Sequence, residues 1–341
     1  MEIIVPAAGL SSRFPNMKPK YLLFDYEHKM MLQKAVADYP DCNITVGILS
    51  EHNAAFDAEK FINHQFGHRV KVVIIKELTK GPADTVYQIL QSAGISDDAE
   101  FLVKDCDSFF THTKTPGNYI CVSDIAEHEV LNRLKAKSFV VSNEQGIITD
   151  IIEKRVVSNK FCVGGYKFES VSEYKKAFES ISSESEIFVS DVISIMLHDG
   201  KIFTEKLISN YVDVGTAQEW FKYNDKPVIF CDIDGTIIKA QRRVGINSYD
   251  DEPEVMTKNV ERLLEYERNG SLIIFTTARE KDQEWVTRAM LARLGFKSNQ
   301  LIIGLPNARR ILINDFDNSN PHPRAEAINI YRNTDTLDHY L

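Results

Sequence analysis

Short apolar runs alternate along the chain with longer stretches in which apolar residues recur at helical spacing. Such alternation is typical of a mostly parallel β-sheet covered by helices on both faces, so the pattern predicts an α/β protein. In the first part of the chain the predicted strands are 3–5, 44–49, 70–75, 101–103, 119–122, 138–141 and 163–168, and the predicted helices are 31–38, 53–66, 83–93 and 189–197.

The pattern ends and starts again at a polar stretch near residue 225. Helix 217–222 is followed by the polar residues 223–227, and a new apolar run begins at 228. Because 341 residues are enough for about two domains of ordinary size, we predict one domain over 1–225 and a second over 226–341. The elements predicted for the second domain are strands 228–230, 272–275 and 311–313 and helices 255–267 and 280–294.

Composition and charge narrow the classes of function. With 43% hydrophobic and 26% charged residues the chain has the composition of a folded globular protein. A net charge of −9 argues against nucleic acid as the main partner. No apolar run approaches the ~20 residues that a bilayer needs, and residues 1–6 do not start a signal peptide, so we expect no membrane contact and a cytoplasmic location. The five scattered cysteines include no C-x-x-C pair and are expected to be reduced.

The segment between the first predicted strand and the first predicted helix, residues 6–20, combines small residues with cations. Small residues let backbone N–H groups approach an anion closely, and the cations spread positive charge over it. A small-residue turn alone would fit any tight loop, but the added cations favour a polyphosphate site. The residues concerned are Ala8, Gly9, Ser11 and Ser12 for the backbone contacts and Arg13, Lys18 and Lys20 for the charge.

A Gly-containing loop followed by Arg and then by Pro-Lys resembles the nucleotidyltransferases that make nucleotide sugars and CDP-alcohols. Five later segments, all in the order of that family, extend the resemblance over the whole first domain, and Ser11 stands where many members have a second glycine. The resemblance implies a Rossmann-like domain with a mixed, mostly parallel sheet. It assigns base recognition to Gly81, Pro82, Ala83 and Thr85, metal binding to Asp107 and Asp213, acceptor contacts to Glu153 and Lys154, and the turn against the acceptor to Gly165.

The residue types fit this chemistry. Two carboxylates at the ends of strands form a hard-oxygen site for Mg²⁺, while Arg13 and Lys20 stabilise the triphosphate and Lys154 holds the attacking phosphate. Asp105 is an alternative to Asp107 as the metal ligand. Capping of turns by the aspartates, and a solvated surface position for Lys154, are the structural alternatives.

Two carboxylates, Asp232 and Asp234, follow the predicted strand 228–230 in the sequence D-x-D-G-T. At this spacing they can share one metal ion, and one can attack a phosphoryl group that the other protonates. The motif resembles the haloacid-dehalogenase superfamily. That resemblance makes Asp232 the nucleophile, Asp234 the acid–base, Thr277 in Thr276-Thr277-Ala278-Arg279 the phosphate binder, and Asp315 in Ile313-Asn314-Asp315-Phe316-Asp317 a third Mg²⁺ ligand beside the other two.

Two departures from that superfamily stand out. Residues 304–310 offer no lysine before the last predicted strand, so Arg309 or Arg310 would have to replace it, and we count Arg310 as a phosphate contact. Asn314 begins the fourth motif in place of an acid. The spacing of the motifs leaves no room for an inserted cap, so we expect a small capless α/β domain.

These observations favour a bifunctional enzyme. We expect transfer of a nucleotidyl group from a nucleoside triphosphate to a phosphorylated sugar or polyol, with Mg²⁺ and release of pyrophosphate, for capsular or other surface polysaccharide precursors. The segment Gly81-Pro82-Ala83 fits cytidylyl, thymidylyl or uridylyl transfer, and CTP is favoured because the loop resembles that of the small cytidylyltransferases. The second domain would be an Mg²⁺-dependent phosphatase. The alternatives are a nucleotide-binding regulatory or scaffold protein and a phosphatase whose first domain only recruits substrate. The sequence leaves open whether the chain forms a homo-oligomer.

Overall fold

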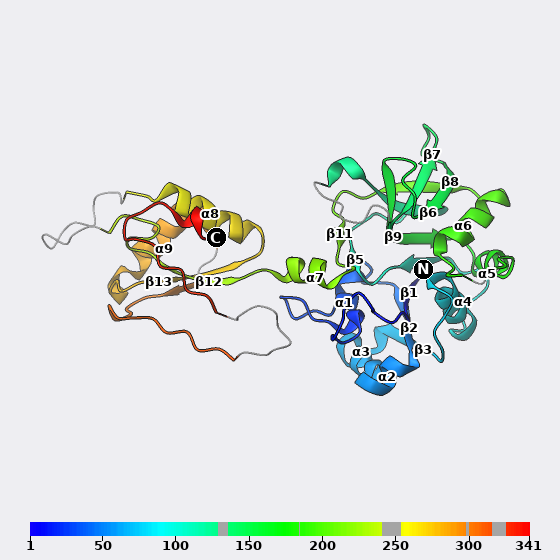
Figure 1. The fold of residues 1–341 in the computed structure, drawn as a ribbon, viewed down its shortest axis with the longest axis horizontal. Helices are drawn as coiled ribbons and strands as arrows, with labels where there is room; N and C mark the ends of the chain where they lie inside the picture. The colour runs from blue at the N-terminus through cyan, green and yellow to red at the C-terminus, as the bar shows by residue number, and fades with distance from the viewer. Residues whose placement is uncertain (129–135, 184, 241–253, 298–299, 316–324) are drawn as a thin grey trace, which may run out of the picture. The chain divides into compact units, whose positions relative to one another are not determined.

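The computed structural model describes residues 1–128, 136–183, 185–240, 254–297, 300–315 and 325–341. The chain divides into two compact units, Met1–Asn224 and Asp225–Leu341, each of which is described by itself (Figure 1). The division falls in the polar stretch where the sequence pattern starts again.

A nine-stranded mixed sheet forms the centre of the described part of the first unit. Its main path runs β10-β6-β9-β4-β1-β2-β3, and β7 and β8 form a hairpin attached to β9. The neighbours β4, β1, β2 and β3 are parallel, as are β6 and β10, while β9 runs antiparallel to β4 and β6. The strands are β1 Glu2–Ala7, β2 Asn43–Leu49, β3 Val70–Ile75, β4 Phe101–Lys104, β6 Asn118–Asp124, β7 Ser138–Ser142, β8 Ile148–Glu153, β9 Lys160–Phe168 and β10 Phe203–Leu207.

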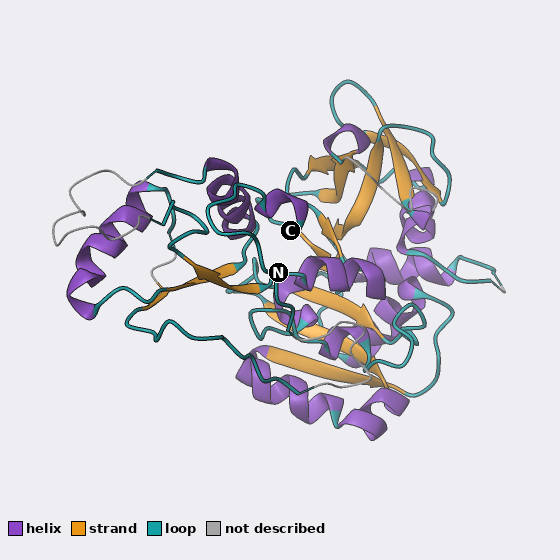
Figure 2. Cartoon of the chain, turned by 60° about the vertical axis from the view of Figure 1, so that its left-hand side comes forward, coloured by secondary structure: helices purple, strands orange, loops and turns teal. Residues whose placement is uncertain are grey.

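Helices cover both faces of this sheet, as the alternation of β1 requires (Figure 2). Ile4 packs with α4, α5 and α6 on one face, whereas Ile3 and Val5 pack with α1 and α3 on the other. The helices are α1 Met31–Ala35, α2 Ser50–Phe56, α3 Ala58–Phe66, α4 Pro82–Ser92, α5 Val171–Glu179, α6 Val189–His198 and α7 Ala217–Asn224, with short 3₁₀ turns η1 Lys20–Leu22, η2 Gly67–Arg69 and η3 Ile125–Glu127.

The predicted strands of the first unit are confirmed, and one predicted helix is divided. Asp57 adopts φ +48° and separates α2 from α3, where the periodicity predicts one helix over 53–66. None of the helices in the described ranges is long and apolar enough to cross a membrane.

A second, two-stranded sheet joins distant parts of the first unit. β5 Ser108–Phe109 pairs antiparallel with β11 Val212–Asp213, so that Ser108 lies opposite Asp213. The N–H of Val214 also donates to the carbonyl of Asp107, at 3.0 Å. This pairing brings Asp213, on β11, beside Asp107, the residue that directly precedes β5.

The described part of the second unit contains a parallel three-stranded sheet in the order β12-β13-β14. Phe275 and Ile273 of β13 are buried with Leu263 of α8 and Leu291 of α9 in the unit's own core. The elements are β12 Val228–Asp232, α8 Thr257–Arg268, β13 Leu272–Thr276, η5 Lys281–Gln283, α9 Glu284–Arg293, β14 Gln300–Ile302 and η6 Leu337–His339.

The prediction of a strand over 311–313 is wrong. Ile311, Leu312 and Ile313 are not in a strand, and their exposed fractions are 66%, 51% and 90%. The strand beside β13 is β14 instead, where Leu301 packs against the core. Both runs are short and apolar, so the sequence alone does not show which of them is buried.

Candidate active site

The loop after β1 and the loop after β4 start from the carboxyl ends of neighbouring parallel strands, which is where ligands bind in open α/β sheets. Ser11 has φ +53°, a left-handed conformation that glycine adopts more easily. Its carbonyl accepts from the N–H of Phe14 at 2.8 Å, and its Oγ accepts from the N–H of Lys20 at 3.2 Å. Serine therefore keeps the loop turn and also fixes the start of the lysine segment. Of the other predicted loop residues, Ala8 is buried and Gly9 and Ser12 are exposed.

Asp107 lies between two of the predicted cations. Its Oδ2 is 2.6 Å from Nζ of Lys20 and 3.4 Å from a guanidinium nitrogen of Arg13. Burial by itself would raise the pKa of Asp107, but the charges of Lys20 and Arg13 outweigh it and hold that pKa below its usual range. Burial likewise acts to lower the pKa of Lys20, and the charge of Asp107 reverses this and raises it. Both groups therefore stay charged.

Asp213 has a lysine of its own, which the sequence analysis missed. Nζ of Lys137 lies 2.5 Å from Oδ2 of Asp213 and 2.6 Å from the hydroxyl of Tyr211. The other oxygen, Oδ1, accepts from the N–H of Gly215 at 2.9 Å. Lys137 precedes β7 and belongs to none of the motifs that the resemblance covers, so only the fold shows that it belongs here.

A second missed lysine organises the turn that carries the aspartates. Lys104, completely buried at the end of β4, donates to the carbonyls of Asp105 and Ser108 at 2.9 and 2.5 Å and to Oγ of Ser108 at 2.8 Å. Burial lowers the pKa of this lysine to about 8, although nearby carboxylates act to raise it. Three hydrogen bonds from one ammonium hold the turn 105–108 in a single shape.

Asp105 packs against the predicted glycine turn. Its N–H donates to the carbonyl of Gly164 at 2.9 Å, and a Cβ on Gly164, which has φ +82°, would lie 2.8 Å from the carboxyl carbon of Asp105. A Cβ on the neighbouring Gly165 would lie 2.7 Å from the ring of Phe110. Burial, with the charge of Asp107, raises the pKa of Asp105. Only glycines therefore fit beside this carboxylate.

The predicted acceptor residues lie at the open end of the β7–β8 hairpin. Oε2 of Glu153 accepts from the hydroxyls of Ser138, which lies opposite on β7, and of Ser190 at 2.7 Å. Nζ of Lys154 lies 3.7 Å from Glu186 and 4.1 Å from the centre of the Phe188 ring. The Lys154 side chain is 51% exposed, so its ammonium is accessible to a ligand.

The predicted base-recognition segment is connected to this end of the hairpin through Ile187. The carbonyl of Ile187 accepts from Ala83 N–H at 3.2 Å, and its N–H donates to the carbonyl of Lys80 at 2.6 Å. A Cβ on Gly81, which has φ +130°, would lie 2.5 Å from the Ile187 carbonyl. Pro82 begins α4, and the buried Thr85 hydroxyl lies 2.7 Å from that of Thr79.

The donor set of the first unit fits a magnesium ion. Among the described residues no three His, Cys, Asp or Glu side chains gather into a cluster. Mg²⁺, however, is commonly held by one or two carboxylates together with substrate phosphates. Asp213 on β11 and Asp107, directly before the paired β5, provide those two carboxylates.

In the second unit, parallel pairing places Asp232 opposite Thr276 at the carboxyl ends of β12 and β13. Asp234 is held by two neighbours: Arg279 approaches Oδ1 at 2.8 Å and Oδ2 at 3.0 Å, and the buried hydroxyl of Thr277 donates to Oδ2 at 3.1 Å. Arg279 also contacts the hydroxyl of Thr287 at 3.1 Å. The predicted residues Asp232, Asp234 and Thr277 therefore lie together.

Asp232 itself is exposed, and two arginines act on it. Partial withdrawal from water, together with the charge of Asp234, raises the pKa of Asp232, while Arg310 and Arg332 act in the opposite direction. Arg332 was not predicted. Its side chain lies beside Gly235, where a Cβ would meet its Cγ at 2.7 Å. Arg310 donates to the carbonyl of Ala308 at 2.5 Å.

The predicted metal set of the second unit is not brought together within the described ranges. Asp315 follows the exposed run 311–313, and Phe316 and Asp317 lie outside the described residues. Both oxygens of Asp234 already contact Arg279. Asp232, Asp234 and Asp315 therefore do not form a three-carboxylate cluster here.

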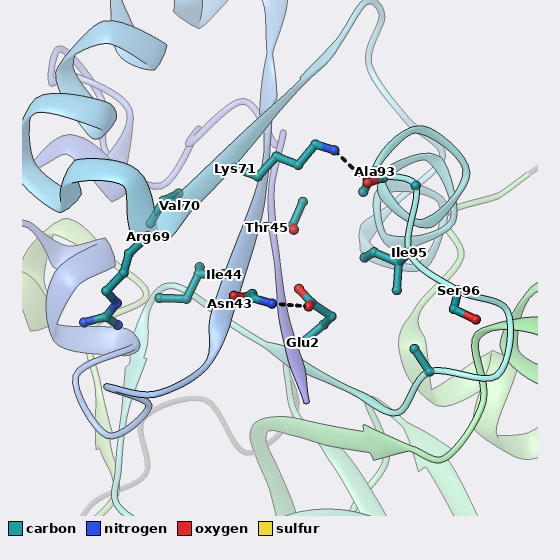
Figure 3. A pocket seen from close by; sticks show the side chains of 12 residues that line it. Glu2, Asn43, Ile44, Thr45, Arg69, Val70, Lys71, Ala93, Ile95 and Ser96 are labelled. Carbon is teal, nitrogen blue, oxygen red and sulfur yellow. Dashed lines mark hydrogen bonds between the residues drawn. The ribbon is translucent and has the colours of Figure 1, made fainter.

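A pocket of the first unit lies away from these residues (Figure 3). It is lined by the amino-end residues Glu2 of β1, Asn43 of β2 and Lys71 of β3. Asn43 donates to Glu2 at 2.7 Å, and Lys71 donates to the carbonyl of Ala93 at 2.6 Å. The pocket is thus at the opposite edge of the sheet from the candidate site, and no predicted site residue lines it.

No protein-family model and no curated protein sequence matches the chain. Solved structures are similar in fold. A nucleoside-diphosphate-sugar pyrophosphorylase from Vibrio cholerae RC9 has a TM-score of 0.55 at 18% identity over 64% of this chain and 98% of that one. The inositol-1-phosphate CTP transferase from T. maritima has 0.53 at 17%, over 64% and 90%. An apo UDP-glucose pyrophosphorylase has 0.51 at 15%, over 65% and 95%.

These likenesses show the fold. The chain contains the Rossmann-like mixed α/β fold of nucleotidyltransferases, with a mostly parallel central sheet, so the predicted fold class is confirmed. The matched share is close to that of the first unit, 224 of 341 residues. The resemblance of the second unit to the haloacid-dehalogenase superfamily stays a prediction.

Proposed function

We propose that the first unit transfers a nucleotidyl group from a nucleoside triphosphate to a phosphorylated sugar or polyol and releases pyrophosphate. One observation carries the proposal: the pairing of β5 with β11 brings Asp213 next to Asp107, which directly precedes β5, and each of these carboxylates contacts a lysine. The neighbours named for this type of reaction share the fold. A protein that only binds a nucleotide has no need of such a pair of carboxylates.

The residues would act by positioning and by neutralising charge. An oxygen of the acceptor's phosphate attacks the α-phosphorus in line, a new P–O bond forms, and the bond from the α-phosphorus to the bridging oxygen breaks with its electrons leaving on pyrophosphate. Arg13 and Lys20 would stabilise the triphosphate, and Lys154 would hold the attacking phosphate. Mg²⁺ bound by Asp107 and Asp213 would supply positive charge to the phosphates. We prefer Asp107 to Asp105 as ligand, because its carboxylate is kept ionised.

The same proposal specifies the acceptor substrate and the nucleobase of the donor triphosphate. Glu153, held by two serine hydroxyls, is suited to accept hydrogen bonds from the hydroxyls of a sugar or polyol. CTP is the preferred donor, since the phosphate loop resembles that of the small cytidylyltransferases and one neighbour is named a CTP transferase. Pyrophosphate release from four nucleoside triphosphates, each with a panel of sugar and polyol phosphates, tests both choices.

Substitution of the charged pairs tests the reaction itself. We expect Lys20→Ala and Asp213→Ala each to lower kcat/KM for pyrophosphate release by at least ~100-fold, because each removes an electrostatic contact to developing charge. Lys160→Ala is the matched control: Lys160 also contacts a carboxylate at 2.5 Å, that of Glu205, which contacts Ser142 at the far end of β7. Wild-type turnover in either site variant would refute the assignment, and nucleotide binding without any turnover would favour a regulatory protein.

For the second unit we propose phosphomonoester hydrolysis through an aspartyl-phosphate. A carboxylate oxygen of Asp232 attacks the phosphorus, the ester P–O bond breaks, and the leaving oxygen takes a proton from water. A second water, whose proton Asp234 accepts, then attacks the phosphorus of the aspartyl-phosphate; the P–O bond to Asp232 breaks, inorganic phosphate leaves and the Asp232 carboxylate is restored. The support is the placement of Asp232, Asp234 and Thr277 at one sheet edge. We further propose that the division near residue 225 separates two independent active sites. The alternative, a phosphatase whose first unit only recruits substrate, requires that this unit releases no pyrophosphate.

A further inference from the structure

Lys137 lies in the candidate site of the first unit without a role in the reaction proposed above. We propose that Lys137, together with Lys154, binds the phosphate group of the acceptor. The inference rests on the proposed function and narrows its acceptor site to one with two lysines.

The backbone places the two lysines side by side. Lys137 directly precedes β7 and Lys154 directly follows β8, and Ser138 lies opposite Glu153 in the hairpin. The hairpin continues one step further, because the N–H of Lys154 donates to the carbonyl of Lys137 at 3.0 Å. Both side chains therefore start from one end of the hairpin, where Glu153 is held.

The ion pair between Lys137 and Asp213 explains how the lysine would become available to a phosphate when a metal ion binds. Its ammonium contacts Asp213 at 2.5 Å, as that of Lys20 contacts Asp107 at 2.6 Å. A divalent cation held by the two carboxylates would compete with both ammonium groups for the same oxygens. Lys137 would then need another anion, and its side chain, 17% exposed, already faces the site.

Tyr211 holds the ammonium at the site during such a change. Its hydroxyl lies 2.6 Å from Nζ of Lys137. This contact keeps the lysine oriented toward the site. By contrast, the ammonium of Lys154 lies 3.7 Å from the exposed carboxylate of Glu186 and 4.1 Å from the centre of the Phe188 ring.

Two lysines match the charge of the expected ligand. A phosphate monoester carries nearly two negative charges at neutral pH, and each ammonium neutralises about one. A single exposed lysine would leave a repulsion between the acceptor and the triphosphate that it must approach. Lys137 gives the acceptor phosphate a second cation, in addition to Lys154, on the side where Asp107 and Asp213 lie.

Binding of inorganic phosphate to the full-length chain tests this. Isothermal titration calorimetry in the presence of MgCl₂ compares wild type with Lys137→Met, Lys137→Arg, Lys20→Ala and the control Lys160→Met. We expect Lys137→Met to weaken phosphate binding by about tenfold or more, since it removes a charge-assisted contact, and Lys137→Arg to retain most of it. Lys160→Met should bind as wild type does.

A second measurement separates this role from simple support of Asp213. Binding of Mn²⁺ alone, followed by electron paramagnetic resonance, should stay unchanged or tighten in Lys137→Met, because a competing cation is gone. Weaker Mn²⁺ binding would mean that Lys137 serves only to hold Asp213, and this would overturn the proposal.

The remaining outcomes are also decisive. Wild-type phosphate affinity in Lys137→Met, or binding lost in Lys20→Ala alone, would overturn the proposal, the latter because the phosphate then sits in the nucleotide loop. If Lys137→Met does not fold, as judged by circular dichroism, Lys137→Gln replaces it under the same criteria. Loss of phosphate binding in Lys137→Met with no pyrophosphate release by wild type supports the phosphate site and refutes only the proposed reaction.

Discussion

The two units each carry a pair of aspartates, and the pairs are built differently. Asp107 and Asp213 come from distant segments joined by the pairing of β5 with β11, and each has a lysine from a further segment. Asp232 and Asp234 are two positions apart at the end of one strand. There a single arginine, Arg279, contacts both carboxylate oxygens of Asp234.

This difference places charge differently in the two sites. The lysine and arginine around Asp107 lower its pKa against the effect of burial, so the first site is a balanced set of fixed charges. In the second, partial desolvation and the charge of Asp234 raise the pKa of Asp232. Arg310 and Arg332 oppose this without reversing it. The Asp232 carboxylate is therefore less neutralised than that of Asp107, and a less neutralised carboxylate is the better nucleophile. The first site is therefore suited to hold ligands, and the second to attack one.

The largest effect is expected from a substitution in the second pair of aspartates, Asp232 and Asp234, alone. Asp232→Asn keeps the shape of the side chain and removes the nucleophile, so hydrolysis of phosphomonoesters should fall by at least ~1,000-fold. Release of inorganic phosphate by purified full-length protein measures it. Pyrophosphate release by the first unit should stay at the wild-type rate, and the exposed Asp282→Asn is the matched control.

Two results would contradict this prediction. Hydrolysis that survives in Asp232→Asn would exclude Asp232 as nucleophile. A parallel fall in pyrophosphate release would show that the two sites are not independent.

A smaller effect, on the stability of the first unit, is expected from the packing of Gly164 against Asp105, which lies beside the pair Asp107 and Asp213. Gly164→Ala should destabilise the first unit by about 2–3 kcal/mol, because its Cβ would overlap Asp105 in addition to the cost of a positive φ. Gly200→Ala is a close control, since φ is +81° there and nothing lies within 4 Å of the added Cβ. It should cost only about 1 kcal/mol. Urea unfolding followed by circular dichroism compares the two.

Equal losses of stability in the two variants would show that the contact with Asp105 is unimportant. A large loss for Gly164→Ala accompanied by a lower kcat for pyrophosphate release would link Asp105 to the geometry of the site.

The sequence predicts the local part of this architecture well. Apolar alternation is enough to locate β1, β2 and β3, and the spacing of Asp232 and Asp234 is visible in the sequence because both follow one strand. The same criterion fails at 311–313, where an equally apolar run lies exposed. Tertiary packing decides which of two apolar runs is buried, and the local sequence pattern does not show this.

What the sequence could not show is the set of contacts made by tertiary structure. Lys137 belongs to no motif, and the segment Lys104-Asp105-Cys106-Asp107 points to its aspartates and gives Lys104 no role. The hairpin and the buried end of β4 bring these two lysines to the aspartates. Arg332 reaches the second site from a segment far from the D-x-D motif. A charged residue at the border of a buried strand is the one signal that could have indicated Lys104.

The smallest expected effect concerns the protonation of His112 in the first unit. His112 lies between the hydroxyls of Tyr39 and Tyr119, at 3.1 and 2.9 Å. Burial, with the charges of Lys206 and Lys104, lowers its pKa from 6.5 to about 4. Between these values the unfolded chain binds a proton that the folded chain does not. Stability present above pH 6.5 is therefore lost as the pH falls toward 4.

Because His112 is partly accessible to solvent, we expect it to account for about 1 kcal/mol of this loss. The chain has two tryptophans, the buried Trp220 in the first unit and the exposed Trp285 in the second, so Trp285→Phe leaves a fluorescence signal from the first unit alone. In that background, urea unfolding at pH 7 and pH 5 should show a smaller loss of stability for His112→Gln than for the parent. Equal losses would mean that His112 binds its proton equally in both states.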